Sequence, residues 1–348
     1  MNSISKWLRM GNEIDFSVSL YYGGGLGDLT HRLYDSYYLR ALRHIKTVFP
    51  NLKVYLFLDT ARNIESVKAL FDVNPYLECI VACRQEFLNQ DIYAFATNLM
   101  GRKKSEIGKY LPDIPNEVVF QRVVNRAYEL LAFPRLRTIT MDDFFQQLKL
   151  DINYFEMDEP TVYLKPEETT YGQAIKKELC PVDEKLVAIH FFSGDGLGMI
   201  KPSMADKIIR WLIDRKYRIA ILGTERESNP DLHESDFKDM VLVLKEFKGH
   251  PHVKYLCDDS NIRMKVSVIA NSDYMICNDS GLMHIAWLYK TKTISLFPKY
   301  TPQDRFQKEG GYYWAIVKNE PYTSYIFCDE TGKFDITLLE QRINNFKE

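Results

Sequence analysis

Along the first third of the chain, blocks of apolar residues alternate with segments of mixed polarity, as expected where strands and helices take turns. Apolar runs of strand length lie at Phe16–Tyr22, Val54–Leu58 and Ile80–Ala82. Between them, apolar residues recur at helical spacing from about Leu29 to Val48 and from Ile64 to Phe71. The pattern predicts β-α-β-α-β, the first half of a doubly wound parallel sheet.

The same alternation begins again after residue 185. Apolar runs predict five more strands, at Leu186–Phe192, Ile219–Leu222, Val253–Leu256, Tyr274–Cys277 and Thr293–Phe297. Helical spacing between these runs predicts helices at Ser203–Arg215, Phe237–Phe247, Ile262–Ala270 and after Gly281. A second α/β domain therefore follows the first.

Acids and prolines in Asn153–Glu168 predict a linker, and a short helix is expected at Tyr171–Leu179. The final segment, Asp335–Phe346, predicts a helix whose apolar face packs back across the joint between the domains. We therefore expect an N-terminal domain at residues 1–165, a C-terminal domain at 166–330 and a returning helix at 331–348.

Composition places this chain among ordinary globular proteins. Its 348 residues exceed what one hydrophobic core usually serves, which agrees with two domains. A net charge of −2 argues against a dedicated nucleic-acid binder. The six cysteines form no Cys-x-x-Cys pair or Cys/His cluster, so they predict no zinc site and fit a reducing cytosol.

The N-terminus lacks an apolar stretch long enough for a signal peptide, and no apolar run has the length of a membrane span. We expect a cytoplasmic protein. Trp7, Leu8 and Met10 beside two basic residues leave two interpretations open, peripheral contact with the inner face of a membrane or packing against the domain.

The segment 272–297 organises the candidate chemistry, because it reads as strand, tight turn, helix and strand. Its turn, Asn278-Asp279-Ser280-Gly281, stands where a helix begins, and free N–H groups there favour an anion. Ser280 and Gly281 allow a phosphate close to the backbone, and His284 lies one turn into the helix. An ordinary turn followed by a core histidine explains this segment equally well.

Polar residues also follow the other predicted strands of the second domain. They are Ser193-Gly194-Asp195, Thr224-Glu225 and Asp258-Asp259-Ser260. Because the carboxyl ends of parallel strands share one edge of the sheet, these residues and the Asn278–Gly281 turn are expected around one crevice. Lys201, just before Pro202 and the next helix, is the cation expected to reach a pyrophosphate there.

The first predicted strand ends in a glycine-rich loop that contains Gly24, Gly25 and Gly27 and is followed by Asp28. No Gly-Lys-[Ser/Thr] follows, which excludes a P-loop, and Asp28 stands where a dinucleotide fingerprint needs a third glycine or alanine. Together with Asp59, the loop also looks like that of an S-adenosylmethionine-dependent methyltransferase. Alternatively, the glycines let a ligand rest against the loop and Asp28 serves as a general base, or Asp28 merely caps the helix.

Basic residues gather in the N-terminal domain. They outnumber acidic residues between Leu99 and Thr140, and several more lie on the predicted helix 29–48. Charged runs are usually solvated faces, but two in one domain favour an anionic partner for that domain.

Taken together, these features resemble the GT-B fold, in which two Rossmann-like domains face each other across a cleft and a C-terminal helix packs back across the joint. Gly27-Asp28, Lys201 and above all Asp279-Ser280-Gly281-Leu282-Met283-His284 resemble glycosyltransferase family 9, the heptosyltransferase-like enzymes. The second glycine loop, Ser193–Gly198, is longer and richer in glycine than the usual family segment. The N-terminal domain after Ile80 matches little.

The resemblance implies an inverting transfer of a sugar from a nucleotide-sugar, without a metal or other cofactor. Asp28 would be the catalytic base, with Gly24, Gly25 and Gly27 forming its loop on the acceptor side. Donor-binding residues would be Ser193, Lys201, Thr224, Glu225, Asp279, Ser280, Gly281, Met283 and His284. The sequence contains no Asp-x-Asp motif, in line with a metal-independent mechanism.

The acceptor expected from the basic N-terminal domain is an anionic or lipid-linked glycan such as a lipopolysaccharide core, with a modified nucleic-acid base as a second class. The alternatives are a methyltransferase or NAD-linked enzyme that uses the Gly23–Gly27 loop, and a nucleotide-sugar-binding protein that has lost catalysis. The sequence specifies neither the donor sugar nor the oligomeric state.

Overall fold

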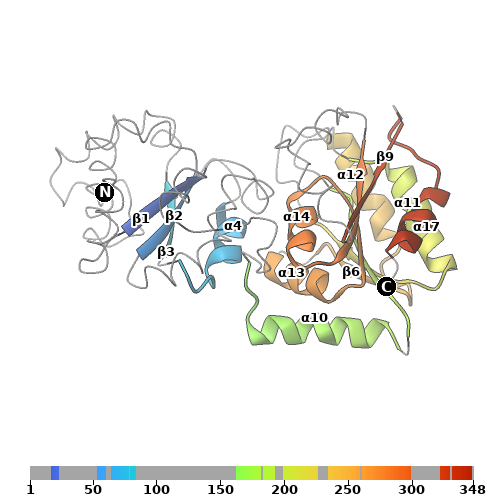
Figure 1. The fold of residues 1–348 in the computed structure, drawn as a ribbon. Helices are drawn as coiled ribbons and strands as arrows, with labels where there is room; N and C mark the ends of the chain where they lie inside the picture. The colour runs from blue at the N-terminus through green and yellow to red at the C-terminus, as the bar shows by residue number, and fades with distance from the viewer. Residues whose placement is uncertain are drawn as a thin grey trace. The chain divides into compact units, whose positions relative to one another are not determined.

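The fold is taken from a computed structural model of the chain, drawn in Figure 1. The residues it describes are 17–22, 53–59, 64–77, 79–83, 162–181, 183–192, 199–225, 234–258, 261–298, 322–329 and 331–346. The chain divides into two compact units, and the main boundary between them falls between Tyr163 and Leu164. Within the described ranges, no helix is both long and apolar enough to cross a membrane.

The N-terminal unit contains a three-stranded parallel sheet in the order β1-β2-β3. Its strands are β1 (Ser17–Tyr22), β2 (Lys53–Asp59) and β3 (Cys79–Cys83), and helix α4 (Ile64–Phe71) lies between the last two in sequence. The side chains of Leu70 and Phe71 at the end of α4 are buried. The three predicted strands and the 64–71 helix are confirmed, whereas the predicted helix 29–48 lies outside the described residues.

The C-terminal unit is built on a six-stranded sheet whose paired strands all run parallel, in the order β6-β5-β4-β7-β8-β9. The strands are β4 (Leu186–His190), β5 (Arg218–Leu222), β6 (Val253–Leu256), β7 (Tyr274–Asn278), β8 (Lys292–Phe297) and β9 (Thr323–Phe327). In chain order this is 3-2-1-4-5-6, the doubly wound arrangement of dinucleotide-binding folds. The predicted α/β class and the five predicted strands are confirmed.

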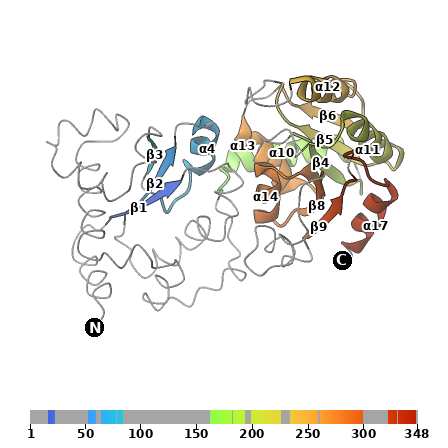
Figure 2. The same cartoon turned by 90° about the horizontal axis from the view of Figure 1, so that it is seen from above.

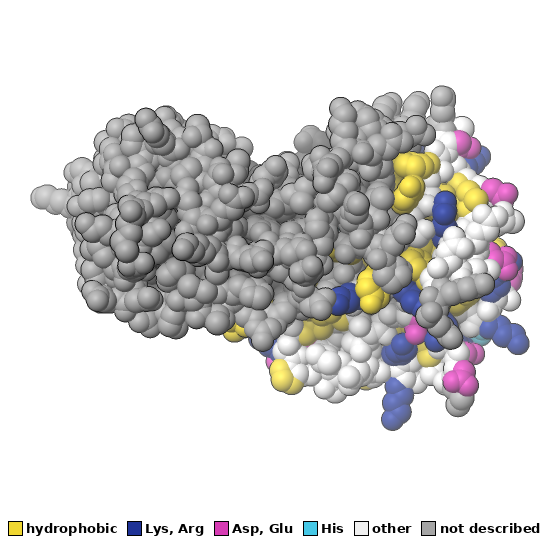
Figure 3. All heavy atoms as spheres, viewed as in Figure 1, with side chains coloured by type: hydrophobic (Ala, Val, Ile, Leu, Met, Phe, Trp, Pro, Cys, Tyr) yellow, Lys and Arg dark blue, Asp and Glu magenta, His cyan; other side chains and the backbone are white. Residues whose placement is uncertain are grey.

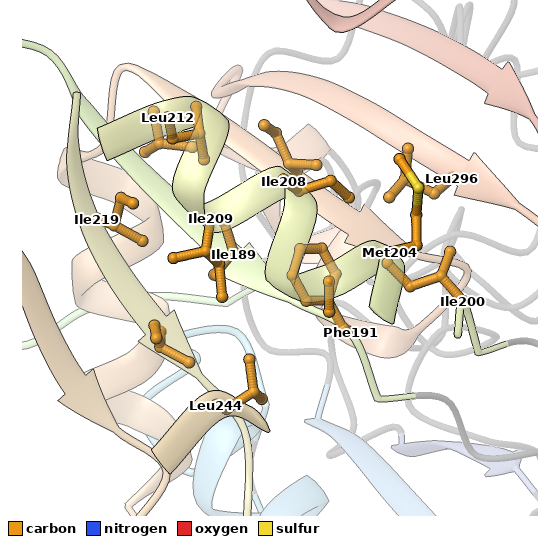
Figure 4. Packing of buried hydrophobic residues seen from close by; sticks show 14 of the residues in the cluster. Ile189, Phe191, Ile200, Met204, Ile208, Ile209, Leu212, Ile219, Leu244 and Leu296 are labelled. Atoms are coloured by element: carbon orange, nitrogen blue, oxygen red, sulfur yellow. The ribbon is translucent and has the colours of Figure 1, made fainter. Parts of the chain in front are cut away.

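Helices cover both faces of this sheet (Figure 2). On one face lie α11 (Pro202–Asp214), α12 (Glu234–Lys245) and α17 (Thr337–Asn345). On the other lie α10 (Pro166–Leu179), α13 (Ile262–Asn271) and α14 (Gly281–Leu288). In Figure 4, α11 places Met204, Ile208 and Ile209 over Ile189 and Phe191 of the central strand and its extension. This packing fixes the strand ends from which the candidate site is built.

Helix α10 corrects the predicted linker, which was expected to extend to Glu168. The helix begins at Pro166, because proline at the first helical position loses no hydrogen bond and acidic residues favour a first turn. The Glu168 carboxylate also accepts a hydrogen bond from the backbone N–H of Lys165 at 2.7 Å. Acids and a proline that resemble a linker are here the start of a helix.

The C-terminal helix was predicted within Asp335–Phe346 and is found as α17. Its Leu339 and Ile343 are buried in the core of the C-terminal unit, and the Phe346 ring lies 6.3 Å from the Tyr274 ring. The apolar face predicted from sequence therefore packs on its own sheet. The expected return toward the N-terminal domain stays a prediction.

The surface of the C-terminal unit carries both signs of charge. In the view of Figure 3, Lys, Arg, Asp and Glu side chains are interspersed over this unit. Exposed ion pairs such as Arg210–Asp206 and Lys254–Glu178 belong to this mixture.

Candidate functional site

The strand order marks the place where a ligand is expected. The chain leaves β4 toward β5 and β6 on one side, and after β6 it crosses to β7 on the other side of β4. In open α/β sheets, ligands bind outside the carboxyl ends of the strands where the order reverses in this way. In this protein that point lies beyond His190 of β4 and Asn278 of β7.

Side chains tie these strand ends together. The buried Asn278 amide donates through Nδ2 to the Phe191 carbonyl at 2.5 Å, which joins β7 to the residue after β4. His190 Nδ1 lies 3.1 Å from the Leu222 carbonyl at the end of β5. Because a carbonyl oxygen can only accept, Nδ1 carries the proton in this bond. The carboxyl ends of β5, β4 and β7 thus form one fixed rim.

The predicted turn after β7 lies on this rim and leads directly into α14. Ser280 is the N-cap residue in extended conformation, but its side chain makes no capping hydrogen bond. Ser280 Oγ and Asn278 Oδ1 are both shielded from solvent and have no hydrogen-bond partner among the described residues. Since buried polar atoms are normally satisfied, these two atoms mark a place where a ligand or water belongs.

His284 lies beneath the turn rather than in front of it. Its side chain is 2% exposed, and its Nε2 is 3.8 Å from Asp279 Oδ1. Met283 beside it is also buried. The structure therefore brings Asp279, Ser280, Gly281 and His284 together at the start of α14, with the buried imidazole near the Asp279 carboxylate, and their donor-binding roles stay predictions.

Thr224 and Glu225 follow β5 at the same edge of the sheet. The Glu225 carboxylate accepts hydrogen bonds from Lys245 Nζ at 2.8 Å and from the Tyr255 hydroxyl at 3.0 Å. The hydrogen bond from Lys245 is the main cause that lowers the pKa of Glu225 below its usual value. A carboxylate held ionised in this way is a fixed acceptor for ligand hydroxyl groups.

Lys201 is the N-cap residue of α11 and is half exposed. Its Nζ lies 3.3 Å from the Asp236 carboxylate on α12. To contact a diphosphate, the lysine has to exchange this exposed ion pair, and such pairs are weak. Its donor-binding role stays a prediction.

Five predicted site residues, Gly24, Gly25, Gly27, Asp28 and Ser193, lie outside the described residues, so their roles stay predictions. Sequence reasoning in turn missed the partly buried His190 and the buried Lys265, which lie near the rim. The signal was present, because each is a polar residue inside an otherwise apolar strand or helix face. Among the described residues, no group of three His, Cys, Asp or Glu side chains could hold a metal ion.

Comparison with solved structures identifies the fold class. The fold is α/β of the GT-B type, as expected, because solved heptosyltransferases share it over nearly the whole chain. Escherichia coli ADP-heptose lipopolysaccharide heptosyltransferase II matches with a TM-score of 0.53 and 12% identity, over 94% of this chain and 98% of that one. E. coli heptosyltransferase WaaC with ADP-2-deoxy-2-fluoro heptose matches with a TM-score of 0.54 and 11% identity, over 95% and 100%.

Sequence comparison matches one part of the chain to a family model. Residues 206–312 match the model of glycosyltransferase family 9 (heptosyltransferase), which confirms the predicted resemblance for this part of the chain. Lipooligosaccharide heptosyltransferase 2 of Haemophilus influenzae is 27% identical over 137 residues, which are 33% of this chain and 38% of the relative. Its counterpart from Campylobacter jejuni is 41% identical over 73 residues, 20% and 22% of the two chains. The matches thus span well under half of these curated relatives.

Acid should destabilise the site through His190. Burial lowers the pKa of His190 to about 4, and the neighbouring Lys265 ammonium acts in the same direction. The unfolded chain therefore binds more protons between pH 6.5 and 4, so the stability contributed by neutral His190 is present above pH 6.5 and is lost as the pH falls. Its share amounts to about 2 kcal/mol between pH 7 and 5.

Urea unfolding of the wild type and of His190→Gln at both pH values checks this expectation. Glutamine still donates to the Leu222 carbonyl but does not titrate. Between pH 7 and pH 5, the free energy of unfolding should fall by about 2 kcal/mol less in the variant than in the wild type. Equal losses in the two proteins would contradict the assignment.

Proposed function

We propose that this protein is a glycosyltransferase that moves a sugar from a nucleotide-sugar to a hydroxyl group of an anionic acceptor. The observation that carries the proposal is the start of α14, where Asn278 Oδ1 and Ser280 Oγ have no hydrogen-bond partner in the described part of the chain and lie at the point of reversed strand order. Free N–H groups and the helix dipole favour a phosphate at such a place. The family 9 match covers this segment, which favours a sugar donor over S-adenosylmethionine or NAD.

In the proposed reaction, the diphosphate of the donor rests on the Ser280–Gly281 backbone and on Lys201. Ser193 closes the same crevice, while Thr224, Glu225 and Asp279 contact the nucleoside and the sugar. Asp28 removes the proton of the acceptor hydroxyl while the oxygen of that hydroxyl attacks the sugar carbon. Because the attack displaces the diphosphate directly, the configuration at that carbon inverts. The departing diphosphate is stabilised by backbone N–H groups and Lys201, without a metal.

ADP-heptose is the first donor to test, because E. coli WaaC was solved with ADP and with an ADP-heptose analogue. The proposed acceptor is a phosphorylated or carboxylated glycan of the lipopolysaccharide-core type, at the inner face of a membrane. A hydroxylated nucleic-acid base is the second acceptor class. Both follow from the basic residues of the N-terminal domain.

Thermal-shift measurements with ADP, GDP, UDP, S-adenosylmethionine and NAD test the class. We expect a nucleoside diphosphate to raise the melting temperature, since binding to the native state stabilises it. Mass spectrometry with ADP-heptose and lipopolysaccharide-core glycans then tests transfer. Stabilisation by S-adenosylmethionine or NAD alone would overturn the proposal, and donor binding with neither transfer nor donor hydrolysis would indicate a non-catalytic protein.

Lys201→Ala should weaken binding of the preferred nucleoside diphosphate roughly tenfold, as expected for the loss of one hydrogen bond to a charged group. Isothermal titration measures this change. Lys207→Ala, on the same helix and also exposed, is the matched control and should bind like the wild type. Asp236→Asn releases Lys201 from its ion pair and should not weaken binding. An unchanged affinity in Lys201→Ala would remove this residue from the donor site.

A further inference from the structure

Lys265 is a buried lysine on α13, on the face of the sheet opposite α11. Its side chain is 7% exposed, and its Nζ donates a hydrogen bond to the carbonyl of Gly223, directly after β5. Lysine is almost never this buried without a specific partner, because removing an ammonium from water is unfavourable. The packing of α13, whose Val266 and Ile269 fill the core, does not require a charge at this position.

The ammonium of Lys265 lies among the carboxyl ends of three adjacent strands. Besides its bond to Gly223, it acts electrostatically on His190 at the end of β4 and on Cys257 directly after β6. Burial lowers the pKa of His190 and raises that of the Cys257 thiol to about 12. The Lys265 charge lowers both pKa values, because it favours the neutral imidazole and the thiolate. Lys265 thus supports the half of the rim that carries Thr224 and Glu225.

The segment 223–225 is fixed at both ends. At its end, the Glu225 N–H donates to the Cys257 carbonyl at 3.1 Å, and the Glu225 side chain is held by Lys245 and Tyr255. At its start, the Phe192 ring lies so close to Gly223 that an added Cβ would come within 2.3 Å of it. The backbone at Gly223 therefore packs directly against this ring with no room for a side chain, and Lys265 binds its carbonyl.

We propose that Lys265 is a positioning residue for the nucleoside half of the donor. By holding the Gly223 carbonyl, it keeps Thr224 and Glu225 where they meet the nucleoside, while the diphosphate is bound separately at the start of α14. This inference rests on the proposed function. It makes a specific prediction, because losing Lys265 should impair recognition of the nucleoside more than recognition of the phosphates.

Isothermal titration of Lys265→Met with the preferred nucleoside diphosphate and with inorganic pyrophosphate separates the two effects. We expect the dissociation constant of the nucleoside diphosphate to rise roughly tenfold and that of pyrophosphate to stay within about twofold. In transfer assays, KM for the donor should rise while kcat is retained. Lys265→Arg should recover most of the affinity, because it restores a charged donor to Gly223.

Lys254→Met, which removes an exposed lysine of β6 that pairs with Glu178 at 2.9 Å, controls for the lost charge and should bind as the wild type does. If Lys265→Met fails to fold, Lys265→Gln replaces it. The glutamine amide ends one bond short of the lysine ammonium, so we expect the same selective loss of nucleoside diphosphate binding. Unchanged affinity, or equal weakening for pyrophosphate and the nucleoside diphosphate, would overturn the role of Lys265. A wild-type protein that binds no nucleoside diphosphate would instead overturn the proposed function itself.

Discussion

Replacing Asp28 by alanine is expected to reduce sugar transfer by roughly 10²–10⁴-fold, the usual contribution of a general base. Donor affinity should stay close to that of the wild type, because Asp28 is not among the proposed donor-binding residues, which all lie after residue 190 in the sequence. Single-turnover transfer assays and isothermal titration of the same preparation measure the two quantities. The combination of lost transfer and retained binding is what distinguishes a base from a residue that shapes the donor site.

Asp28→Asn extends the test, since it keeps the shape of the side chain and removes only its basicity. Its transfer rate should be as low as that of the alanine variant. Asp72→Ala removes an exposed carboxylate that belongs to no proposed site and should transfer at the wild-type rate. Turnover retained in Asp28→Asn would mean that another group takes the proton of the acceptor.

The sheet of the C-terminal unit could be predicted from sequence because its strands are short apolar runs buried on both faces. Leu186–His190 and Tyr274–Asn278 are almost fully buried, and such runs between helical segments indicate parallel strands. Strand β9 was missed for the opposite reason. It lies at the edge of the sheet, with Phe327 exposed and burial that changes along the strand, so Thr323–Phe327 forms no continuous apolar run.

For the candidate site, sequence predicted the positions that follow strands but not the groups that hold them. The Asn278–Gly281 turn was identified because cap residues stand between an apolar run and a helical stripe. His190 and Lys265 were missed, because a polar residue within an apolar strand or helix face indicates that it has a partner but not which partner. Each contacts a carbonyl of β5 or of the residue after it, about 30 to 40 positions away in sequence. The order of the strands in the sheet brings these groups together, and that order cannot be inferred from the local spacing of apolar residues.

The contact between α10 and α13 could not be predicted from sequence either. It leads to the second large effect that we expect, a loss of stability when this contact is disrupted. Arg263 on α13 forms a two-pronged ion pair with Glu168 on α10, with N–O distances of 2.5 and 2.6 Å, and both side chains are buried. Burial by itself would raise the pKa of Glu168, but hydrogen bonds from Arg263 and from the Lys165 N–H outweigh it and lower that pKa. The carboxylate is thus held ionised inside the protein.

The contact around this ion pair leaves no room for adjustment. The Gly172 N–H donates to Ser267 Oγ at 3.0 Å, and the Ser267 hydroxyl in turn donates to the Glu168 carbonyl. A Cβ at Gly172 would lie 2.4 Å from the Ser267 carbonyl oxygen, so the two helices are already as close as their backbones allow. If its partner is removed, Glu168 can be hydrated only when the helices move apart and give up these hydrogen bonds.

Arg263→Met is therefore expected to lower the free energy of unfolding by about 3–5 kcal/mol, the effect of leaving one buried charge without its partner. Urea unfolding at pH 7 measures it. The double variant Glu168→Leu with Arg263→Met should recover most of the loss, because an apolar pair of similar volume replaces a buried ion pair at little cost. Arg210→Met, which breaks the exposed pair with Asp206, should change stability by less than about 1 kcal/mol. An Arg263→Met variant as stable as Arg210→Met would show that water reaches Glu168 and that α10 is not fastened to the C-terminal unit by this pair.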